Sequence, residues 1–235
     1  MSLNCNELKI SAKSAFEFTL SVFTGFWFIG LAYGIYMQVE GFSFIYPMLM
    51  SACIFGGSLE FVTVGMLLSP FAPIQSLIMA LLIQARHLFY GISMLDKYKN
   101  MGLKKPFLIF MMCDETFAIN YSAKIPGYVD RGYFMLFVSI FNYLYWFTGA
   151  TMGGLLGPLI SFETHGLEFV MTAMFVVIFL ENFLQEKSHV SSYLGFVAGI
   201  TMLVTFGKDN FMIPTMLTIL IVLTVFKNKL QKRVA

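Results

Sequence analysis

The sequence predicts an all-α polytopic membrane protein that folds as a single transmembrane domain over residues 1–235. The first observation is composition: 58% of the residues are hydrophobic and 12% are charged, whereas soluble domains contain about 25% charged residues. The second is the recurrence of apolar runs close to the length of about 20 residues that spans a bilayer as a helix. The third is that the alternation of apolar and polar residues typical of a transmembrane β-barrel is not visible.

Eight apolar segments follow one another along the chain. They are residues 18–37, 44–68, 74–94, 107–121, 133–155, 169–184, 190–206 and 211–226. Residues 1–15 are polar and mildly amphipathic. No cleavable signal is expected, because the apolar run that follows is too long for a signal peptide and lacks a small-residue cleavage site.

Two of these segments are exceptional. Residues 44–68 are interrupted by Gly56-Gly57, and residues 107–121 are short and contain two adjacent acidic residues. Non-helical backbone is tolerated at membrane depth only where protein or a water-filled cavity covers it. We therefore expect two broken or re-entrant segments beside about six full transmembrane helices.

The distribution of basic residues favours this topology over eight plain crossings. With two re-entrant segments, the four-lysine loop of residues 96–105 and the basic tail 227–233 lie inside, and the acidic loop with Glu163 and Glu168 lies outside. Eight plain crossings place residues 96–105 outside, against the positive-inside rule. Both topologies place the two termini in the cytoplasm.

The apolar segments contain five ionisable residues of functional interest. They are Glu60, Arg86, His87, Asp114 and Glu115. A charged side chain near the centre of a membrane helix costs roughly 2.5–3.5 kcal/mol on insertion scales. These groups are therefore expected to pair with one another or to line a water-filled cavity, which predicts a polar site inside the membrane.

The break at Gly56-Gly57-Ser58 has two interpretations. An unwound helix would present free backbone N–H groups to an anionic group such as an amino acid's carboxylate, whereas glycine pairs also serve simply for close packing. Glu60 is either a proton carrier, a partner for a substrate ammonium group, or the structural partner of Arg86.

The segment around Arg86 supplies the cation of the predicted site. Helical spacing places Arg86 and Tyr90 on one face. Arg86 would bind a carboxylate of the substrate or of Asp114 or Glu115, and the internal ion pair is favoured. His87 either relays protons or packs as a hydrogen-bonded side chain. The two acids point about 100° apart on a helix, so one is expected to pair with Arg86 while the other titrates.

Small residues at four-residue spacing predict close helix packing. These patterns are Gly30/Gly34, Gly149/Gly153/Gly157 and Gly195/Gly199. Packing within the chain is favoured over docking of a separate subunit. Asn142 and Trp146 share a stripe with Gly149 and are expected to line a cavity wall.

Other classes of function find little support. The three cysteines are far apart without a CxxC pair, so neither a metal site nor a disulfide is expected. The sequence contains no HExxH, Walker or GxSG motif, so we expect no enzyme and no cofactor. A net charge of +2 with scattered lysines does not predict nucleic-acid binding.

The chain resembles the AzlC family, the large subunits of branched-chain amino-acid exporters linked to azaleucine resistance. The resemblance is carried by GLAYG (30–34), the stretch 41–51 with FGGSLEF (55–61), RHLFYG (86–91), DETFAI (114–119) and WFTGATMGGLLG (146–157). The chain departs from the family pattern at Glu60, where glutamine is expected, and at Phe28, where the first helix often has proline.

This resemblance implies efflux of hydrophobic amino acids across a bacterial inner membrane, driven by an ion gradient, with a small AzlD-type membrane subunit as partner. The substrate-binding candidates are Ser51, Gly56, Gly57, Ser58, Glu60, Arg86, Tyr90 and Asn142. The candidates for proton coupling or ion pairing are Glu60, His87, Asp114 and Glu115. The alternatives are a channel or import-type transporter for another small solute, and an intramembrane enzyme that uses His87 with the two acids.

Overall fold

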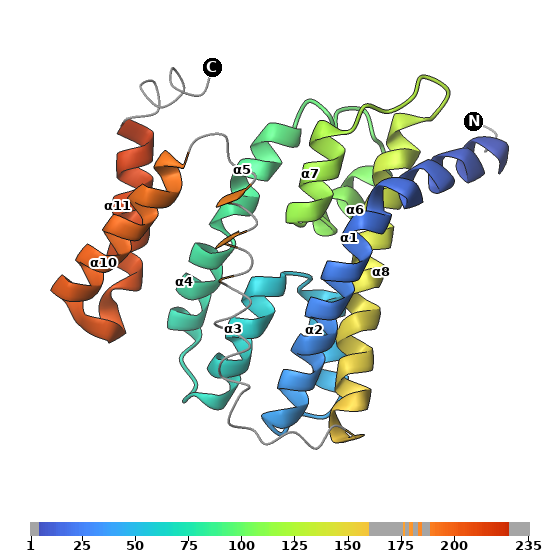
Figure 1. Cartoon of the computed structure of the whole chain (residues 1–235). Helices are drawn as coiled ribbons and strands as arrows, with labels where there is room; N and C mark the ends of the chain where they lie inside the picture. The colour runs from blue at the N-terminus through green and yellow to red at the C-terminus, as the bar shows by residue number, and fades with distance from the viewer. Residues whose placement is uncertain (1–4, 160–175, 177–178, 181–182, 185–188, 226–235) are drawn as a thin grey trace. The chain divides into compact units, whose positions relative to one another are not determined.

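The computed structural model describes residues 5–159, 176, 179–180, 183–184 and 189–225 (Figure 1). The chain divides into two compact units, Met1–Glu168 and Phe169–Ala235, and each is described by itself. The described residues form helices and no strands, which confirms the all-α class. The single domain over residues 1–235 stays a prediction. The acidic loop with Glu163 and Glu168, the basic tail 227–233 and most of the predicted segment 169–184 lie outside the described residues.

The first unit contains eight described α-helices and a 3-10 turn. They are α1 (Cys5–Val39), α2 (Ile45–Cys53), α3 (Gly57–Leu68), α4 (Pro73–Ile83), α5 (Ala85–Met94), α6 (Lys104–Phe110), α7 (Asp114–Ser122), α8 (Arg131–Leu156) and η1 (Gly157–Leu159). In the second unit, α10 (Val190–Asn210) and α11 (Met212–Val225) pack against each other. These two helices cover the predicted segments 190–206 and 211–226 as far as the described residues extend.

Two described helices are long and apolar enough to cross a membrane, over Glu7–Val39 and Arg131–Leu159, and the bent pair α4–α5 would be a third. The first helix begins at Cys5, so the polar residues before the apolar run extend it. The last helix of this unit, α8, begins at a side-chain cap, because Asp130 Oδ1 accepts a hydrogen bond from the backbone N–H of Tyr133 at 2.8 Å.

Helices α1 and α8 lie side by side and in parallel (Figure 1), and glycines bring their backbones together. A Cβ added at Gly34 would lie 2.1 Å from the carbonyl oxygen of Ala150, and one at Gly153 would lie 2.1 Å from that of Leu31. No side chain fits in this space, so the prediction that these glycines pack within the chain is confirmed. A Cβ at Gly195, in the second unit, meets no described atom within 4 Å.

Two short hairpins of broken helix come between α1 and α8 in the sequence. Figure 1 shows α2 and α3 starting and finishing at the end of the unit where α1 ends and α4 begins. Helices α6 and α7 form the second hairpin, at the opposite end, where α5 ends and α8 begins. A long element followed by a hairpin therefore occurs twice in opposite directions, which is the arrangement of inverted repeats in many transporters.

The breaks fall at the tips of the hairpins and at one further position. Between α2 and α3 the chain passes through Phe55, whose φ of 46° is in the left-handed region and is unfavourable for a residue with a Cβ. Residues 111–113 separate α6 from α7. The predicted continuous helix over residues 74–94 is wrong in one respect, because it bends by 46° at Gln84, which ends α4 and caps α5.

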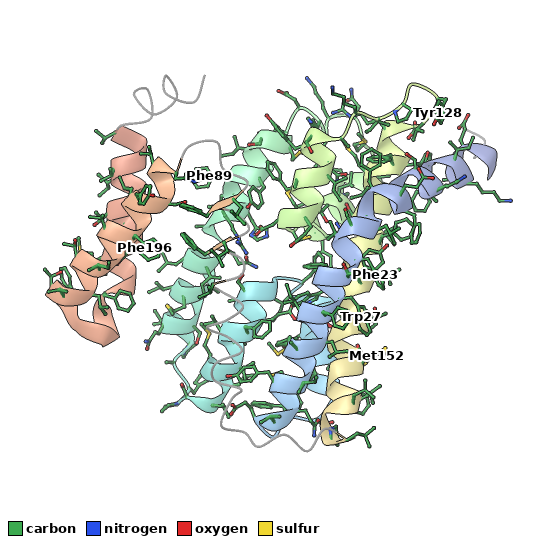
Figure 2. All side chains as sticks on the ribbon, viewed as in Figure 1. Phe23, Trp27, Phe89, Tyr128, Met152 and Phe196 are labelled. Atoms are coloured by element: carbon green, nitrogen blue, oxygen red, sulfur yellow. The ribbon has the colours of Figure 1, made fainter. Side chains whose placement is uncertain are left out.

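A cluster of buried apolar residues supports the tip of the second hairpin. It consists of Ala15, Met94, Tyr98, Leu108, Met112, Val129, Phe134, Met135 and Val138. Outward-facing positions are also apolar: Phe89 on α5 is 57% exposed and Met152 on α8 is 43% exposed (Figure 2). Apolar side chains on the outside, together with polar groups inside, suit a protein surrounded by lipid.

Candidate functional site

Three helix N-termini bring the predicted polar residues together. Ser58, Arg86 and Asp114 lie in the first turns of α3, α5 and α7 respectively. The first N–H groups of a helix lack partners within the helix and carry partial positive charge. The tips of the two hairpins and the bend at Gln84 therefore form one polar region inside the first unit.

An ion pair connects two of these helix ends. Arg86 Nη1 lies 2.7 Å from Asp114 Oδ2, and the two side chains are 34% and 33% exposed. Arg86 Nη2 also donates a hydrogen bond to Ser58 Oγ at 3.1 Å. The predicted internal ion pair is confirmed, with Asp114 as the acid, and Arg86 links α3, α5 and α7.

Glu60 has other partners. Its carboxylate accepts hydrogen bonds from the backbone N–H of Gly56 at 3.0 Å and from Trp146 Nε1 at 3.0 and 3.1 Å, and the residue is completely buried. The alternative that Glu60 pairs with Arg86 is wrong. Ser58 and Glu60 are two positions apart, so they point about 200° apart on the helix. Ser58 contacts Arg86, and Glu60 points toward α8.

The glycines at the first break have distinct roles. A Cβ at Gly56 would lie 2.1 Å from Gln84 Nε2, so this glycine lets the side chain at the bend approach the hairpin tip. A Cβ at Gly57 would lie 3.1 Å from the Trp146 ring. The backbone N–H of Gly56 already binds Glu60, so this part of the predicted carboxylate site is occupied by the chain's own side chain.

Asn142 faces the second hairpin tip. It is completely buried on α8, and its Nδ2 donates to Thr116 Oγ1 at 3.0 Å. Thr116 in turn contacts Cys113 Sγ at 3.1 Å. Sequence reasoning did not single out Thr116 or Gln84 for the site. Only their positions in the sequence could have indicated these residues: Thr116 directly follows the two acids, and Gln84 precedes Arg86 by two residues.

The other predicted residues lie around this centre. Tyr90 stacks on Phe117 at 4.3 Å between ring centroids and interacts with Asp114. His87 meets Tyr90 edge-on at 5.5 Å, and Glu115 interacts with its neighbours Cys113 and Asp114. The structure does not bring Ser51 to the ion pair, because its hydroxyl donates to the carbonyl of Met48 within α2.

The site contains polar atoms that the described protein does not satisfy. Gln84 Oε1, Arg86 Nε, Asp114 Oδ1 and Asn142 Oδ1 are buried without a hydrogen-bond partner among the described residues. Buried polar groups normally have partners. Both donors and acceptors are in excess here, so the site suits a small ligand with both positive and negative groups.

An open apolar groove of about 360 Å³ lies between α5 and α6, and several side chains of its wall are largely exposed. His87 and Met112 line it at the end next to the ion pair, and its wall includes Leu88, Ile92 and Ile109. Among the described residues no group of three or more His, Cys, Asp or Glu side chains is arranged to hold a metal ion. The first unit thus contains a charged polar centre and, beside it, an open apolar groove.

This fold and site define a helical membrane protein with a polar centre built from broken helices. The family model described as AzlC protein matches residues 21–160, which include every predicted site residue. The chain belongs to the AzlC family.

Relatives match over nearly the whole chain. It is 53% identical over 220 residues to the branched-chain amino acid transport protein AzlC of Bacillus subtilis, covering 94% of this chain and 87% of that protein. It is 46% identical over 229 residues to an uncharacterized membrane protein of Haemophilus influenzae, covering 97% and 94%. A Helicobacter pylori membrane protein is 34% identical over 220 residues, covering 93% and 96%. No solved structure matches the chain significantly.

Proposed function

We propose that this chain is the large subunit of a secondary active exporter of branched-chain or other hydrophobic amino acids, coupled to protons. The observation that carries the proposal is the Arg86–Asp114 ion pair between two broken helices, in a chain 53% identical to a protein named for branched-chain amino acid transport. Charged residues within membrane helices generally mark transport pathways.

The ion pair supplies both charges that an amino acid's head group needs. The substrate carboxylate binds the Arg86 guanidinium in a bidentate manner, and the substrate ammonium binds Asp114. Each protein charge exchanges one partner for another, so no charge stays unpaired inside the membrane. The unpartnered Arg86 Nε and Asp114 Oδ1 supply the additional hydrogen bonds.

The apolar groove between α5 and α6 supports the proposed choice of hydrophobic substrates. It begins at His87 and Met112, beside the ion pair, and its wall is mainly aliphatic. Its volume of about 360 Å³ exceeds that of a leucine or methionine side chain. A hydrophobic side chain placed there would bury apolar surface against this wall.

The fold supports the topology with six crossings and two re-entrant hairpins. Figure 1 shows α1 beginning at the end of the first unit where α5 ends and α8 begins. The lysines near the N-terminus and those of residues 96–105 thus lie at one end, as the positive-inside rule requires of the cytoplasmic side. We place both termini in the cytoplasm of a bacterial cell, and the small AzlD-type subunit beside this chain in the inner membrane.

The test is efflux of labelled valine, leucine and methionine from preloaded cells that express this chain, with and without an AzlD-type subunit. We expect faster efflux and lower intracellular accumulation when both are present, and neither effect with Arg86→Gln. Unchanged accumulation in every combination would overturn the exporter. Faster uptake would instead support import, and consumption of the amino acid by purified protein would support an enzyme.

A further inference from the structure

Glu60 joins two helices from the inside of the first unit. Its carboxylate accepts from Gly56 N–H, at the broken start of its own helix α3, and from the Trp146 indole N–H on α8. The bond to Gly56 resembles half of a capping box, in which an acid of the first turn binds the backbone N–H of the cap residue. Glu60 thus holds the first hairpin tip against α8.

The partners of this carboxylate are donors only. A backbone N–H and an indole N–H donate hydrogen bonds and accept none. In the described part of the chain the ion pairs are Arg86–Asp114 and Lys104–Asp130, and neither includes Glu60. The arrangement therefore suits an ionised carboxylate. A protonated carboxyl group would have to turn one oxygen away from these donors, because its O–H needs an acceptor.

Proton binding at Glu60 can affect the Arg86–Asp114 ion pair through the first turn of α3. Glu60 Oε1 accepts from both the Gly56 N–H and Trp146 Nε1, whereas Oε2 accepts from Trp146 alone. A proton on Oε2 therefore removes one of the two contacts to Trp146, and it also removes the negative charge that strengthens the remaining bonds. The Trp146 ring packs against Tyr33 and Phe26. The contact between the first turn of α3 and α8 is then weaker. That same turn carries Ser58, which accepts a hydrogen bond from Arg86.

We propose that Glu60 is a proton-operated latch, which holds α3 against α8 when ionised and releases the hairpin tip when it binds a proton. The latch rests on the proposed function for its link to transport, since it would couple proton entry to movement at the Arg86–Asp114 site. It also revises the assignment of the Gly56 N–H, which binds an internal carboxylate in the latched state.

Other titratable groups near Glu60 are few in the described structure. Tyr33 from α1 and Tyr143 from α8 interact with it electrostatically, and tyrosine stays neutral well below its ordinary pKa of about 10. Arg86 and Asp114 approach the same helix turn through Ser58. His87 and Glu115 belong to the same region, so both need control variants.

Trp146 reports directly on the latch. The chain contains two tryptophans, and the other, Trp27, packs against Phe23 and Phe28 on α1 (Figure 2). In the purified full-length Trp27→Phe protein, the fluorescence of Trp146 is measured between about pH 5 and about pH 9. We expect one reversible transition, which Glu60→Gln removes and which Glu115→Gln and His87→Asn retain.

The parent measurement alone can overturn the latch. Flat Trp146 emission across this range means that Glu60 does not change its proton there. A transition that persists in Glu60→Gln assigns the titration to another group. The first outcome uses the parent alone, so it does not depend on the folding of the Glu60 variant. The second is measured only on a Glu60→Gln protein that is folded.

Transport assays with the protein in lipid vesicles distinguish a failure of the latch from a failure of the proposed function. A gradient of one pH unit supports about tenfold accumulation per proton exchanged, so we expect Glu60→Gln to lower the ratio of gradient-driven leucine accumulation to leucine exchange by about tenfold. An unchanged ratio overturns the coupling role of Glu60. If the parent moves no amino acid at all, the proposed function fails, whereas the fluorescence transition still decides whether the latch exists.

Discussion

The interface between α1 and α8 and the meeting point of the hairpin tips are built in opposite ways. Along α1 and α8, glycines bring backbone against backbone, with no space for a single added methyl group at Gly34 or Gly153. At the hairpin tips, helices stop short, polar side chains make the contacts, and several buried polar atoms have no described partner. The first region is suited to a fixed frame, and the second to a site that rearranges.

The largest expected effect comes from breaking the frame. Gly34→Ala places a methyl group 2.1 Å from the backbone oxygen of Ala150, so the helices must separate. We expect a loss of about 1–3 kcal/mol or more in the free energy of unfolding, seen as a lower melting temperature in detergent. The matched control is Gly25→Ala on the same helix, where a Cβ meets nothing within 4 Å.

These two variants define the comparison. Alanine favours helix over glycine by up to about 1 kcal/mol, so Gly25→Ala should be neutral or slightly stabilising. Equal destabilisation of both variants would show that the close contact between α1 and α8 does not determine the stability of the frame.

The next effect concerns the ion pair at the hairpin tips. In a double-mutant cycle with Arg86→Gln and Asp114→Asn, we expect a coupling energy of about 1–2 kcal/mol, between the values for exposed and fully buried pairs. Both side chains are about one third exposed, which places them in this range. Thermal or denaturant unfolding of the four proteins gives the coupling energy, and each single variant should lose amino-acid efflux.

The other described ion pair is the control for this cycle. Lys104 and Asp130 are 3.9 Å apart, and the Asp130 side chain is 48% exposed. We expect a coupling energy below about 0.5 kcal/mol for this pair and normal efflux in its single variants. A coupling at Arg86–Asp114 no larger than at this pair would contradict its role as the central contact of the site.

The sequence was sufficient to predict close helix packing within the chain and an internal ion pair of Arg86. Glycine spacing predicted close packing within the chain but not which helices would meet, and the cost of buried charge predicted that Arg86 would find an internal acid. The direction in which Glu60 points could not be predicted, because it depends on how α3 starts after the break. The interrupted, polar stretches of the sequence are consistent with transporter repeats, but the order of long element and hairpin is not visible in it, because the two copies share no recognisable residue repeat.

The bend at Gln84 shows a second limit of sequence reasoning. Residues 77–83 are all apolar and lead directly into Gln84-Ala-Arg86, and neither glycine nor proline marks the bend. The structure places the Gln84 side chain against Gly56, at the other broken helix. The bend is therefore associated with a contact between residues that are distant in the sequence, and the local pattern of apolar residues does not indicate such a contact.

A small effect on stability is expected for Gly56→Ala, and this variant compares the hairpin tips directly with the α1–α8 interface. Gly56→Ala, like Gly34→Ala, places a methyl group 2.1 Å from a neighbouring atom, but here that atom is the end of the flexible Gln84 side chain. Because Gln84 can move away, we expect Gly56→Ala to cost less than about 1 kcal/mol of stability. Displacing Gln84 disturbs the bend just before Arg86, so we expect efflux to fall clearly at nearly normal melting temperature. If stability and efflux fell together in Gly56→Ala as in Gly34→Ala, the hairpin tips would be as rigid as the frame.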